Sequence, residues 1–339
     1  MSKRTSPARL RTTRAIGIAW VTVAIVSACT TGEAASPSTT PPKPKPRVSS
    51  PTVAPSPTPT DSPKTAADRV VVALAGDIAD DDGQDEATAS LLEGVDPDLV
   101  LTLGDHAYPD GTRADYAAQY TPTWGRFRDR TRPAPGNHDY HDEAGNPPYY
   151  YTYFAGQLPD QNGGRFYALD AGRWRIYSLN CEIDCSESSP QVAWLRADLA
   201  ATGAGRHKLA YLHRPRYSCG THGSYDDARG LWRALVGGRV DVIASGHDHN
   251  YQRYPRMDAD GQSSPSGAVS FVAGTGGAGR YKITGYEDEE GCDLASYTTS
   301  DDNGVLVMAL EAGRFSWHFL TTDGSALDAG TMATLDGPR

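Results

Sequence analysis

From residue 69 onward, short apolar stretches rich in β-branched residues recur along the chain, and each stretch ends in polar residues. Runs of this length, bounded by turn-forming residues, are typical of buried β-strands. The pattern predicts six such strands, at residues 69–75, 98–103, 174–179, 208–212, 240–244 and 269–273.

Segments with apolar residues three or four positions apart lie between several of these strands and predict amphipathic helices. The clearest helix begins at Ser189-Pro190, because serine is a good N-cap and proline fits the first turn. It places Val192, Leu195 and Leu199 on one face. Further helices are predicted at 85–94, 113–128 and 225–236, and a closing β-hairpin at 305–310 and 314–321. The alternation of strands and helices, with antiparallel strands at the end, predicts an α/β domain.

The first 66 residues lack this pattern and predict a leader followed by a linker. Residues 1–28 contain five basic residues, no acidic residue and an apolar run at 15–26, which together are typical of a secretory signal peptide. The apolar run is too short to span a bilayer comfortably. Residues 30–66 consist mainly of Ser, Thr, Pro and Ala and cannot bury enough apolar surface to fold, so we expect a semi-rigid linker. Residues 67–339 then form one folded domain.

The end of the leader, Val26-Ser27-Ala28-Cys29, resembles the lipobox of bacterial lipoproteins. In such proteins the cysteine is lipid-modified and becomes the new N-terminus. The resemblance implies an exported, cell-surface lipoprotein that contacts the membrane only through lipidated Cys29. The alternative is an ordinary cleaved signal peptide followed by an unrelated cysteine, which would give a secreted protein.

The charge of the chain argues against a nucleic-acid partner. The whole chain carries 32 basic and 42 acidic residues, and the predicted domain alone carries 23 basic and 40 acidic residues, a net charge of −17. Proteins that bind nucleic acid through the phosphate backbone present a basic surface instead. No second apolar segment long enough for a membrane span follows the leader.

Four cysteines lie in the predicted domain: Cys181, Cys185, Cys219 and Cys292. After export, an even number of cysteines predicts two disulfides, for which three pairings are possible. We favour Cys181 with Cys185, which closes a small loop, and Cys219 with Cys292, which ties two loops together. A zinc site is the alternative, but the sequence lacks the paired C-x-x-C units typical of one.

Residue types that bind metals follow several of the predicted strands. Polar motifs after strands are individually weak signals, because turns commonly contain such residues. In α/β folds, however, the carboxyl ends of parallel strands meet at one edge, so their loops converge. Together the motifs supply seven oxygen and nitrogen donors that suit divalent and trivalent ions, namely Asp77, Asp105, Tyr108, Asn137, His213, His247 and His249.

Such a donor set fits the hydrolysis of a phosphate ester. The reaction is slow because a nucleophile must approach an anion while charge builds on the attacking and leaving oxygens. Two cations lower the pKa of bound water and neutralise the phosphoryl oxygens, which addresses both difficulties. Carboxylate and phenolate ligands favour a trivalent ion, whereas imidazole and amide ligands suit a divalent ion.

On these motifs and their order, the sequence resembles the calcineurin-like metallophosphoesterases, specifically short secreted bacterial members of the purple acid phosphatase-like branch. The match covers most of residues 70–275. Tyr108 is the most discriminating position. A tyrosine ligand separates this branch from relatives that have a histidine in the family's first motif, which begins here at Asp77. The resemblance implies an α-β-β-α sandwich, in which two packed mixed sheets are flanked by helices.

The resemblance also implies the role of each residue. A ferric ion would be held by Asp77, Asp105, Tyr108 and His249. A divalent zinc, manganese or iron ion would be held by Asp105, Asn137, His213 and His247, so that Asp105 bridges the two ions. His138 would contact the phosphate and help protonate the leaving oxygen. His222 would be a second substrate-facing histidine, for which a solvated loop residue is the alternative.

The leading functional hypothesis is an exported, acid phosphatase-like enzyme whose metal-bound hydroxide attacks the phosphorus of a small phosphomonoester. A second hypothesis keeps the metals but changes the substrate to phosphodiesters such as cyclic nucleotides, glycerophosphodiesters or cell-wall polymers. A third is a non-catalytic surface protein with a structural metal site. His138 argues against the third, because a structural site needs no acid or open coordination position.

Overall fold

The computed structural model describes residues 69–81, 83–141, 148–203, 205–284 and 290–335. The chain divides into two units, residues 1–60 and 61–339, and every described residue belongs to the second unit. The predicted leader, Cys29, the linker and the domain boundary at residue 67 lie outside the described residues. Within the described part, no helix has both the length and the apolar character needed to cross a membrane.

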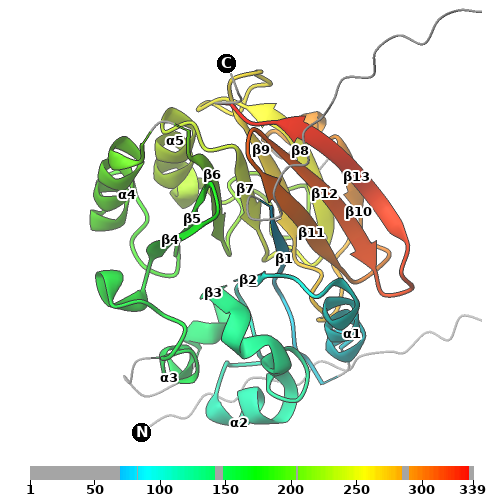
Figure 1. The fold of residues 1–339 in the computed structure, drawn as a ribbon. Helices are drawn as coiled ribbons and strands as arrows, with labels where there is room; N and C mark the ends of the chain where they lie inside the picture. The colour runs from blue at the N-terminus through cyan, green and yellow to red at the C-terminus, as the bar shows by residue number, and fades with distance from the viewer. Residues whose placement is uncertain (1–68, 82, 142–147, 204, 285–289, 336–339) are drawn as a thin grey trace, which may run out of the picture. The chain divides into compact units, whose positions relative to one another are not determined.

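Two mixed β-sheets form the centre of the domain (Figure 1). In the first sheet the strand order is β13-β12-β11-β1-β2-β3. Strands β1, β2 and β3 run parallel to one another, whereas β11, β12 and β13 form an antiparallel extension beside β1. The strands are β1 (Val70–Ala75), β2 (Leu99–Leu103), β3 (Thr131–Ala134), β11 (Gly304–Glu311), β12 (Arg314–Thr321) and β13 (Ala326–Ala333).

The second sheet has the strand order β10-β8-β9-β7-β6-β5-β4. Its four inner strands β5, β6, β7 and β9 are parallel, and antiparallel strands complete both edges. The strands are β4 (Tyr167–Ala171), β5 (Trp174–Ser178), β6 (His207–Leu212), β7 (Val242–Ser245), β8 (Tyr251–Met257), β9 (Ala268–Ala273) and β10 (Tyr297–Thr299).

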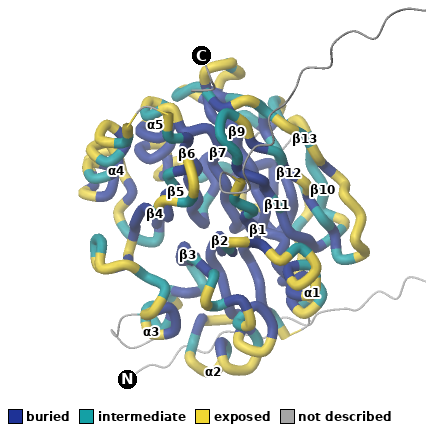
Figure 2. Tube along the Cα trace, in the orientation of Figure 1, coloured by how far each residue is buried: buried dark blue, intermediate teal, exposed yellow. Residues whose placement is uncertain are grey.

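Three apolar cores hold the layers together. The central core lies between the sheets and combines Leu74 and Leu101 from the first sheet with Leu209 and Val242 from the second. Helices α4 and α5 cover the outer face of the second sheet, while α1 and an aromatic cluster cover the outer face of the first. Figure 2 shows the buried positions concentrated on the strands. The predicted α-β-β-α sandwich is therefore confirmed. The helices are α1 (Asp85–Val95), α2 (Arg113–Asp115), α3 (Tyr149–Tyr153), α4 (Pro190–Ala201) and α5 (Arg229–Gly237).

All six predicted strands are present, and so is the closing hairpin β11–β12. The predicted start of α4 is also confirmed, because the Ser189 hydroxyl accepts a hydrogen bond of 3.2 Å from the Val192 amide. The single helix predicted at 113–128 is wrong. The chain instead forms α2, a π-helical turn at Tyr116–Tyr120 and a 3₁₀ helix at Trp124–Arg130. Pro122 lies between the last two and lacks the amide hydrogen that a continuous helix requires.

Both predicted disulfides, Cys181–Cys185 and Cys219–Cys292, are present. The first closes a small loop after β5. The second joins the loop after β6 to the turn that precedes β10. The cysteines are therefore bridged in the favoured pairing and do not form the alternative zinc site.

Candidate metal centre

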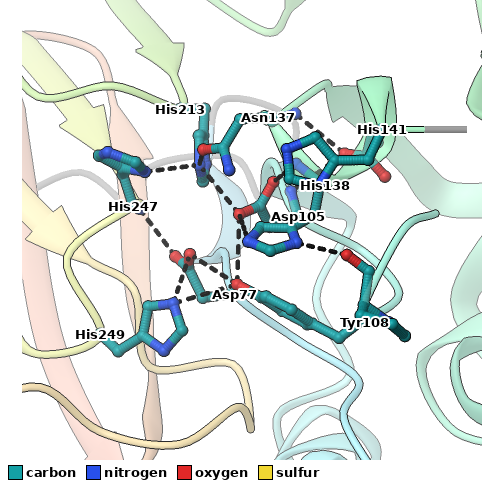
Figure 3. A network of polar contacts seen from close by, with 12 residues as sticks. Asp77, Asp105, Tyr108, Asn137, His138, His141, His213, His247 and His249 are labelled. Carbon is teal, nitrogen blue, oxygen red and sulfur yellow. Dashed lines mark hydrogen bonds and ion pairs between the residues drawn. The ribbon is translucent and has the colours of Figure 1, made fainter. Parts of the chain in front are cut away.

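The loops that carry the predicted metal ligands follow five strands. Three of these strands, β1, β2 and β3, are parallel in the first sheet, and two, β6 and β7, are parallel in the second. Asp77 follows β1, Asp105 follows β2 and Asn137 follows β3, while His213 comes directly after β6. The loop after β7 supplies two imidazoles. All seven predicted ligands lie together in the structure, Asp77, Asp105, Tyr108, Asn137, His213, His247 and His249 (Figure 3).

The backbone turns sharply at three of these residues. Asp77, Asp105 and His247 adopt φ angles of 60°, 52° and 72°, in the left-handed region that non-glycine residues rarely occupy. Each such conformation costs about 1–3 kcal/mol and persists where the surrounding structure fixes it. The Gly136 backbone packs so closely here that a Cβ on it would lie 2.2 Å from Asp105 Oδ1. Close packing therefore aims the ligand side chains at one another.

The first group of donors surrounds the Tyr108 hydroxyl. This hydroxyl lies 3.2 Å from Asp77 Oδ1, 3.2 Å from Asp105 Oδ2 and 3.0 Å from His249 Nε2. His249 Nε2 is also 3.2 Å from Asp77 Oδ1. All four residues are buried. Two carboxylates, a phenol and an imidazole thus point to one small volume.

The second group surrounds His213 Nε2. This nitrogen lies 3.2 Å from Asp105 Oδ2, 3.1 Å from Asn137 Oδ1 and 3.1 Å from His247 Nδ1. Asp105, His213 and His247 form a group that could hold a metal ion. Because Asp105 Oδ2 contacts both Tyr108 and His213, the two groups of donors meet at this one oxygen atom.

The chemistry of the donors fits metal ions better than it fits mutual hydrogen bonds. The facing nitrogens of His213 and His247 share at most one proton between them. The carboxylates of Asp77 and Asp105 are buried, and a buried anion requires a compensating positive charge. Carboxylate and phenol oxygens dominate the first group, whereas imidazole and amide dominate the second. This division matches a harder ion beside a divalent ion.

The pKa values of three of these donors are shifted by their burial and by the charges around them. Burial acts to lower the pKa of His213, but the adjacent Asp105 carboxylate outweighs it and raises the pKa to about 10. Burial lowers the pKa of His247 to about 2, helped by nearby His213 and Arg214. Burial and the Asp105 and Asp77 carboxylates raise the pKa of Tyr108 well above its usual value. Since metal ligands bind in their deprotonated forms, metal uptake would displace protons from His213 and Tyr108.

Further hydrogen bonds fix the orientation of the imidazoles. His213 Nδ1 lies 2.8 Å from the Leu103 carbonyl and donates to it, so Nε2 faces the other donors and is the nitrogen that would lose its proton to bind a metal. His249 Nδ1 bonds the Gly279 carbonyl in the same way. The Tyr281 ring stacks on His249 with centroids 4.0 Å apart. Sequence reasoning did not single out Tyr281, because nothing in its local pattern indicates this contact.

Asp139 connects the loop after β2 with the loop after β3. Its buried carboxylate accepts hydrogen bonds from the amides of Asp105 (3.0 Å) and Gly136 (2.9 Å), from His106 Nδ1 (2.9 Å) and from the Tyr116 hydroxyl (2.8 Å). His106 is a fully buried core histidine. Asp139 ends the segment Gly136-Asn137-His138-Asp139, which contains the predicted ligand Asn137, but nothing in this local pattern indicates its positioning role.

The two histidines predicted to face substrate contact different ligands. The His138 amide donates to Asp105 Oδ1 at 2.8 Å, and its Nδ1 bonds the Pro109 carbonyl. His138 Nε2 lies 4.0 Å from Asp105 Oδ2, at the partly exposed edge of the site. His222 is exposed, and its ring stacks on His247 with centroids 4.3 Å apart. Their roles toward a substrate stay predictions.

Arg214 also reaches the site. Its Nη1 lies 3.2 Å from His247 Nε2. Its position directly after His213 suggests a contact with phosphate, but an ion pair is the interpretation that the sequence favours, because arginines on an acidic domain more often form such pairs. Arg214 does form such a pair, with Glu182, in addition to its contact with His247.

The two packed mixed sheets, with aspartate, asparagine and histidine donors at the strand ends, define this protein as a metal-dependent phosphoesterase. The chain belongs to the calcineurin-like phosphoesterase family, whose family model matches residues 70–251.

Relatives within this family include purple acid phosphatases. The chain is 26% identical to purple acid phosphatase 23 of Arabidopsis thaliana over 260 residues, which cover 67% of this chain and 56% of that protein. Identity to purple acid phosphatase 22 of the same plant is 27% over 273 residues, covering 74% and 60%. Identity to a nucleotide pyrophosphatase/phosphodiesterase of Hordeum vulgare is 26% over 267 residues, covering 64% and 64%. The chain spans less than two thirds of the length of each.

Solved structures share the fold at lower identity. A purple acid phosphatase from yellow lupin (Lupinus luteus) seeds superimposes with a TM-score of 0.61 at 18% identity, covering 80% of this chain and 56% of that chain. GAP50, the anchor in the inner membrane complex of Plasmodium, superimposes with a TM-score of 0.58 at 14% identity, covering 79% and 89%. At these identities the similarity supports the fold alone.

Proposed function

We propose that this chain is an exported phosphatase of the purple acid phosphatase-like branch, which hydrolyses phosphomonoesters with two metal ions. The observation that carries the proposal is the meeting of two donor groups at Asp105 Oδ2, with a tyrosine in one group and an asparagine in the other. The relatives named purple acid phosphatases support the same conclusion.

The proposed reaction divides between the metals and the protein. Two bound ions would activate a water molecule and neutralise the phosphoryl oxygens. The seven ligand residues would hold the ions side by side. His138 Nδ1 donates to the Pro109 carbonyl, so its Nε2 is left to contact the phosphate. The imidazolium form of His138, which carries a proton on both nitrogens, would protonate the leaving oxygen from Nε2.

The identity of the metals belongs to this proposal. We infer a ferric ion in the group around Tyr108, and a zinc, manganese or iron(II) ion in the group around His213. Elemental analysis should find about two metal ions per chain. A tyrosinate bound to ferric iron should give a visible absorption band, and Tyr108→Phe should abolish that band. A colourless protein with only zinc or manganese would contradict the branch assignment.

Turnover of an aryl phosphomonoester tests the proposed activity. His213→Ala should abolish turnover, because the variant removes a ligand of the divalent ion. His318→Ala is the matched control, since His318 lies on the exposed side of β12 and should leave turnover unchanged. Full activity in His213→Ala would refute the ligand assignment. A metal-loaded protein inert toward every phosphate ester would instead support the non-catalytic alternative.

A phosphodiesterase is the second candidate function, because one relative is named a nucleotide pyrophosphatase/phosphodiesterase. The same donor groups would serve such a reaction, since both ester classes present phosphoryl oxygens to the metals. Rates on an aryl phosphomonoester and a bis-aryl phosphodiester, measured side by side, decide between the two. We expect the monoester to be hydrolysed with the higher kcat/KM.

Export and anchoring are a separate proposal, which rests on the leader and on Cys29. We expect the mature protein to begin at Cys29 and to carry lipid there. Mass spectrometry of the mature N-terminus from the host membrane fraction tests this expectation. Cys29→Ser should release the protein from that fraction. An unmodified N-terminus elsewhere would favour the ordinary cleaved signal peptide.

A further inference from the structure

Arg214 is held in a fixed orientation beside the metal centre. Its Nε and Nη2 donate to the two carboxylate oxygens of Glu182 at 2.8 Å and 3.0 Å, which is the fork geometry that arginine forms with carboxylates. Glu182 is itself restrained, because it lies inside the loop closed by the Cys181–Cys185 disulfide. The guanidinium also lies over the Tyr225 ring, 4.9 Å from its centroid.

The remaining edge of this guanidinium faces a predicted metal ligand. Arg214 Nη1 lies 3.2 Å from His247 Nε2, while His247 Nδ1 faces His213 Nε2 within the second donor group. A neutral imidazole that binds a metal through Nδ1 carries its proton on Nε2. Arg214 Nη1 and His247 Nε2 are then both donors and cannot bond each other. The two N–H groups therefore flank a position that requires an acceptor.

We propose that Arg214 is a substrate-positioning residue, which with the Nε2–H of His247 binds an anionic oxygen of the substrate's phosphoryl group. The inference rests on the proposed function and deepens it, because it assigns a preference for monoesters. A phosphomonoester carries up to two charges on three terminal oxygens, whereas a diester carries one charge on two. A fixed cation binds the dianion more strongly.

Two features of the Arg214–Glu182 ion pair support a substrate-positioning role for Arg214 over a purely structural one. Only a fifth of the Arg214 side chain is exposed, so its interaction with an anion is screened less than at an open surface. The Glu182 carboxylate fixes the fork, so little rotational freedom remains to be lost on binding. His222, stacked on the face of the same His247 ring, would border the bound phosphoryl group.

The matched arginines on either side of Pro215 provide the experiment. Arg214→Lys keeps the charge but removes the fork, and Arg214→Gln removes both. Arg216→Lys is the control, because Arg216 pairs with Glu290 and Asp226. The metal-loaded full-length proteins are compared by titration calorimetry with orthophosphate and by kinetics on the monoester and diester.

We expect Arg214→Gln to bind orthophosphate about 10- to 100-fold more weakly, as for the loss of a hydrogen bond to a charged group. Its KM for the monoester should rise, and its monoester-to-diester ratio of kcat/KM should fall. Arg214→Lys should lie between Arg214→Gln and the wild type. Arg216→Lys should match the wild type in all three quantities, and every variant should retain its metals.

Unchanged phosphate binding in both Arg214 variants would overturn the inference. An equal loss of kcat/KM on the monoester and on the diester would also overturn it. Loss of metal from the Arg214 variants would overturn it too, because Arg214 would then act by holding His247. A wild-type protein that binds orthophosphate through Arg214 yet hydrolyses neither ester would refute the proposed activity while supporting the binding role. A wild-type protein that binds no orthophosphate would overturn both.

Discussion

Asp105 joins the two halves of the candidate centre within a single side chain. Its Oδ2 contacts both Tyr108 and His213, and its Oδ1 accepts the amide hydrogen of His138. Burial opposes the charged carboxylate, but His213 outweighs burial and lowers the pKa of Asp105. The side chain is therefore held as an anion at the point where two cations would meet.

Asp105→Asn should keep the size of this side chain and remove its charge. We expect the purified variant to hold fewer than two metal ions and to lose more than about 100-fold in aryl phosphate turnover, because a neutral amide bridges two cations poorly. Elemental analysis and steady-state kinetics measure both quantities. Asp129→Asn is the control, since Asp129 is exposed. Normal metal content in Asp105→Asn would disprove the bridging role.

Gly136 matters because of the space it leaves. A Cβ at this position would lie 2.2 Å from Asp105 Oδ1 and 2.5 Å from the Asp105 amide, so Gly136→Ala must displace Asp105. We expect Gly136→Ala to lose metal and activity. Gly94→Ala in α1 meets no atom within 4 Å and should stabilise the domain by up to about 1 kcal/mol, because alanine has the higher helix propensity. Full metal content in Gly136→Ala would contradict this expectation, because the loop after β3 would then have made room for the Cβ without displacing Asp105.

At the scale of the elements, Asp328 on β13 ties the two sheets together. Its carboxylate accepts hydrogen bonds from Tyr251 (2.8 Å) and from Arg253 (2.8 Å and 3.0 Å), both on β8 of the second sheet. It also accepts one from Trp317 on β12 of its own sheet, at 3.0 Å. Asp328 is thus a buried polar link between β8 and β13, beside the apolar core.

Asp328→Asn should lower the free energy of unfolding by about 3 kcal/mol, because it leaves the largely buried Arg253 guanidinium without its carboxylate. Burial acts to raise the pKa of Asp328, but Arg253 and Tyr251 outweigh it and lower the pKa. The contribution of Asp328 to the free energy of unfolding is therefore fully present above the unfolded-state pKa of its carboxyl group. This contribution is lost as the pH falls through the lower folded-state pKa.

Urea unfolding at neutral and acidic pH measures this effect. The stability difference between wild type and Asp328→Asn should shrink as the pH falls through the folded-state pKa. Asp301→Asn, on an exposed residue, should show no such difference. A difference that stays constant down to strongly acidic pH would contradict the role of the Asp328 charge.

The sequence predicted the inner strands because a strand buried on both faces is a continuous apolar run, as in 208–212. It missed β3, β4, β8, β10 and β13. Strand β3 has four residues including Pro133, and β8 contains Gln252 and Pro255, so neither shows the apolar pattern.

The ligand motifs were visible because each directly follows a strand or lies in a short loop. The contacts of Arg214 with His247, and of Asp328 with β8, depend on packing between distant segments, which local patterns do not encode.

At the scale of the whole domain, the two disulfides should serve different purposes. Cys219–Cys292 spans 73 residues of sequence, whereas Cys181–Cys185 spans four. Loop-closure entropy then predicts a loss of about 4 kcal/mol in the free energy of unfolding when the first is removed, and about 2 kcal/mol for the second. Paired cysteine-to-alanine variants and urea unfolding test this order.

Phosphate binding should follow the opposite order. Glu182 lies inside the small loop, so Cys181→Ala with Cys185→Ala should loosen the carboxylate that orients Arg214 and weaken orthophosphate binding. Removal of Cys219–Cys292 should weaken it less, because the Asp248 carboxylate still accepts the His222 amide at 2.9 Å and holds that loop beside His247. Calorimetry on the same two variants gives the comparison. If the variant that loses more stability also loses more phosphate affinity, binding follows general stability, and the small loop has no separate part in orienting Arg214.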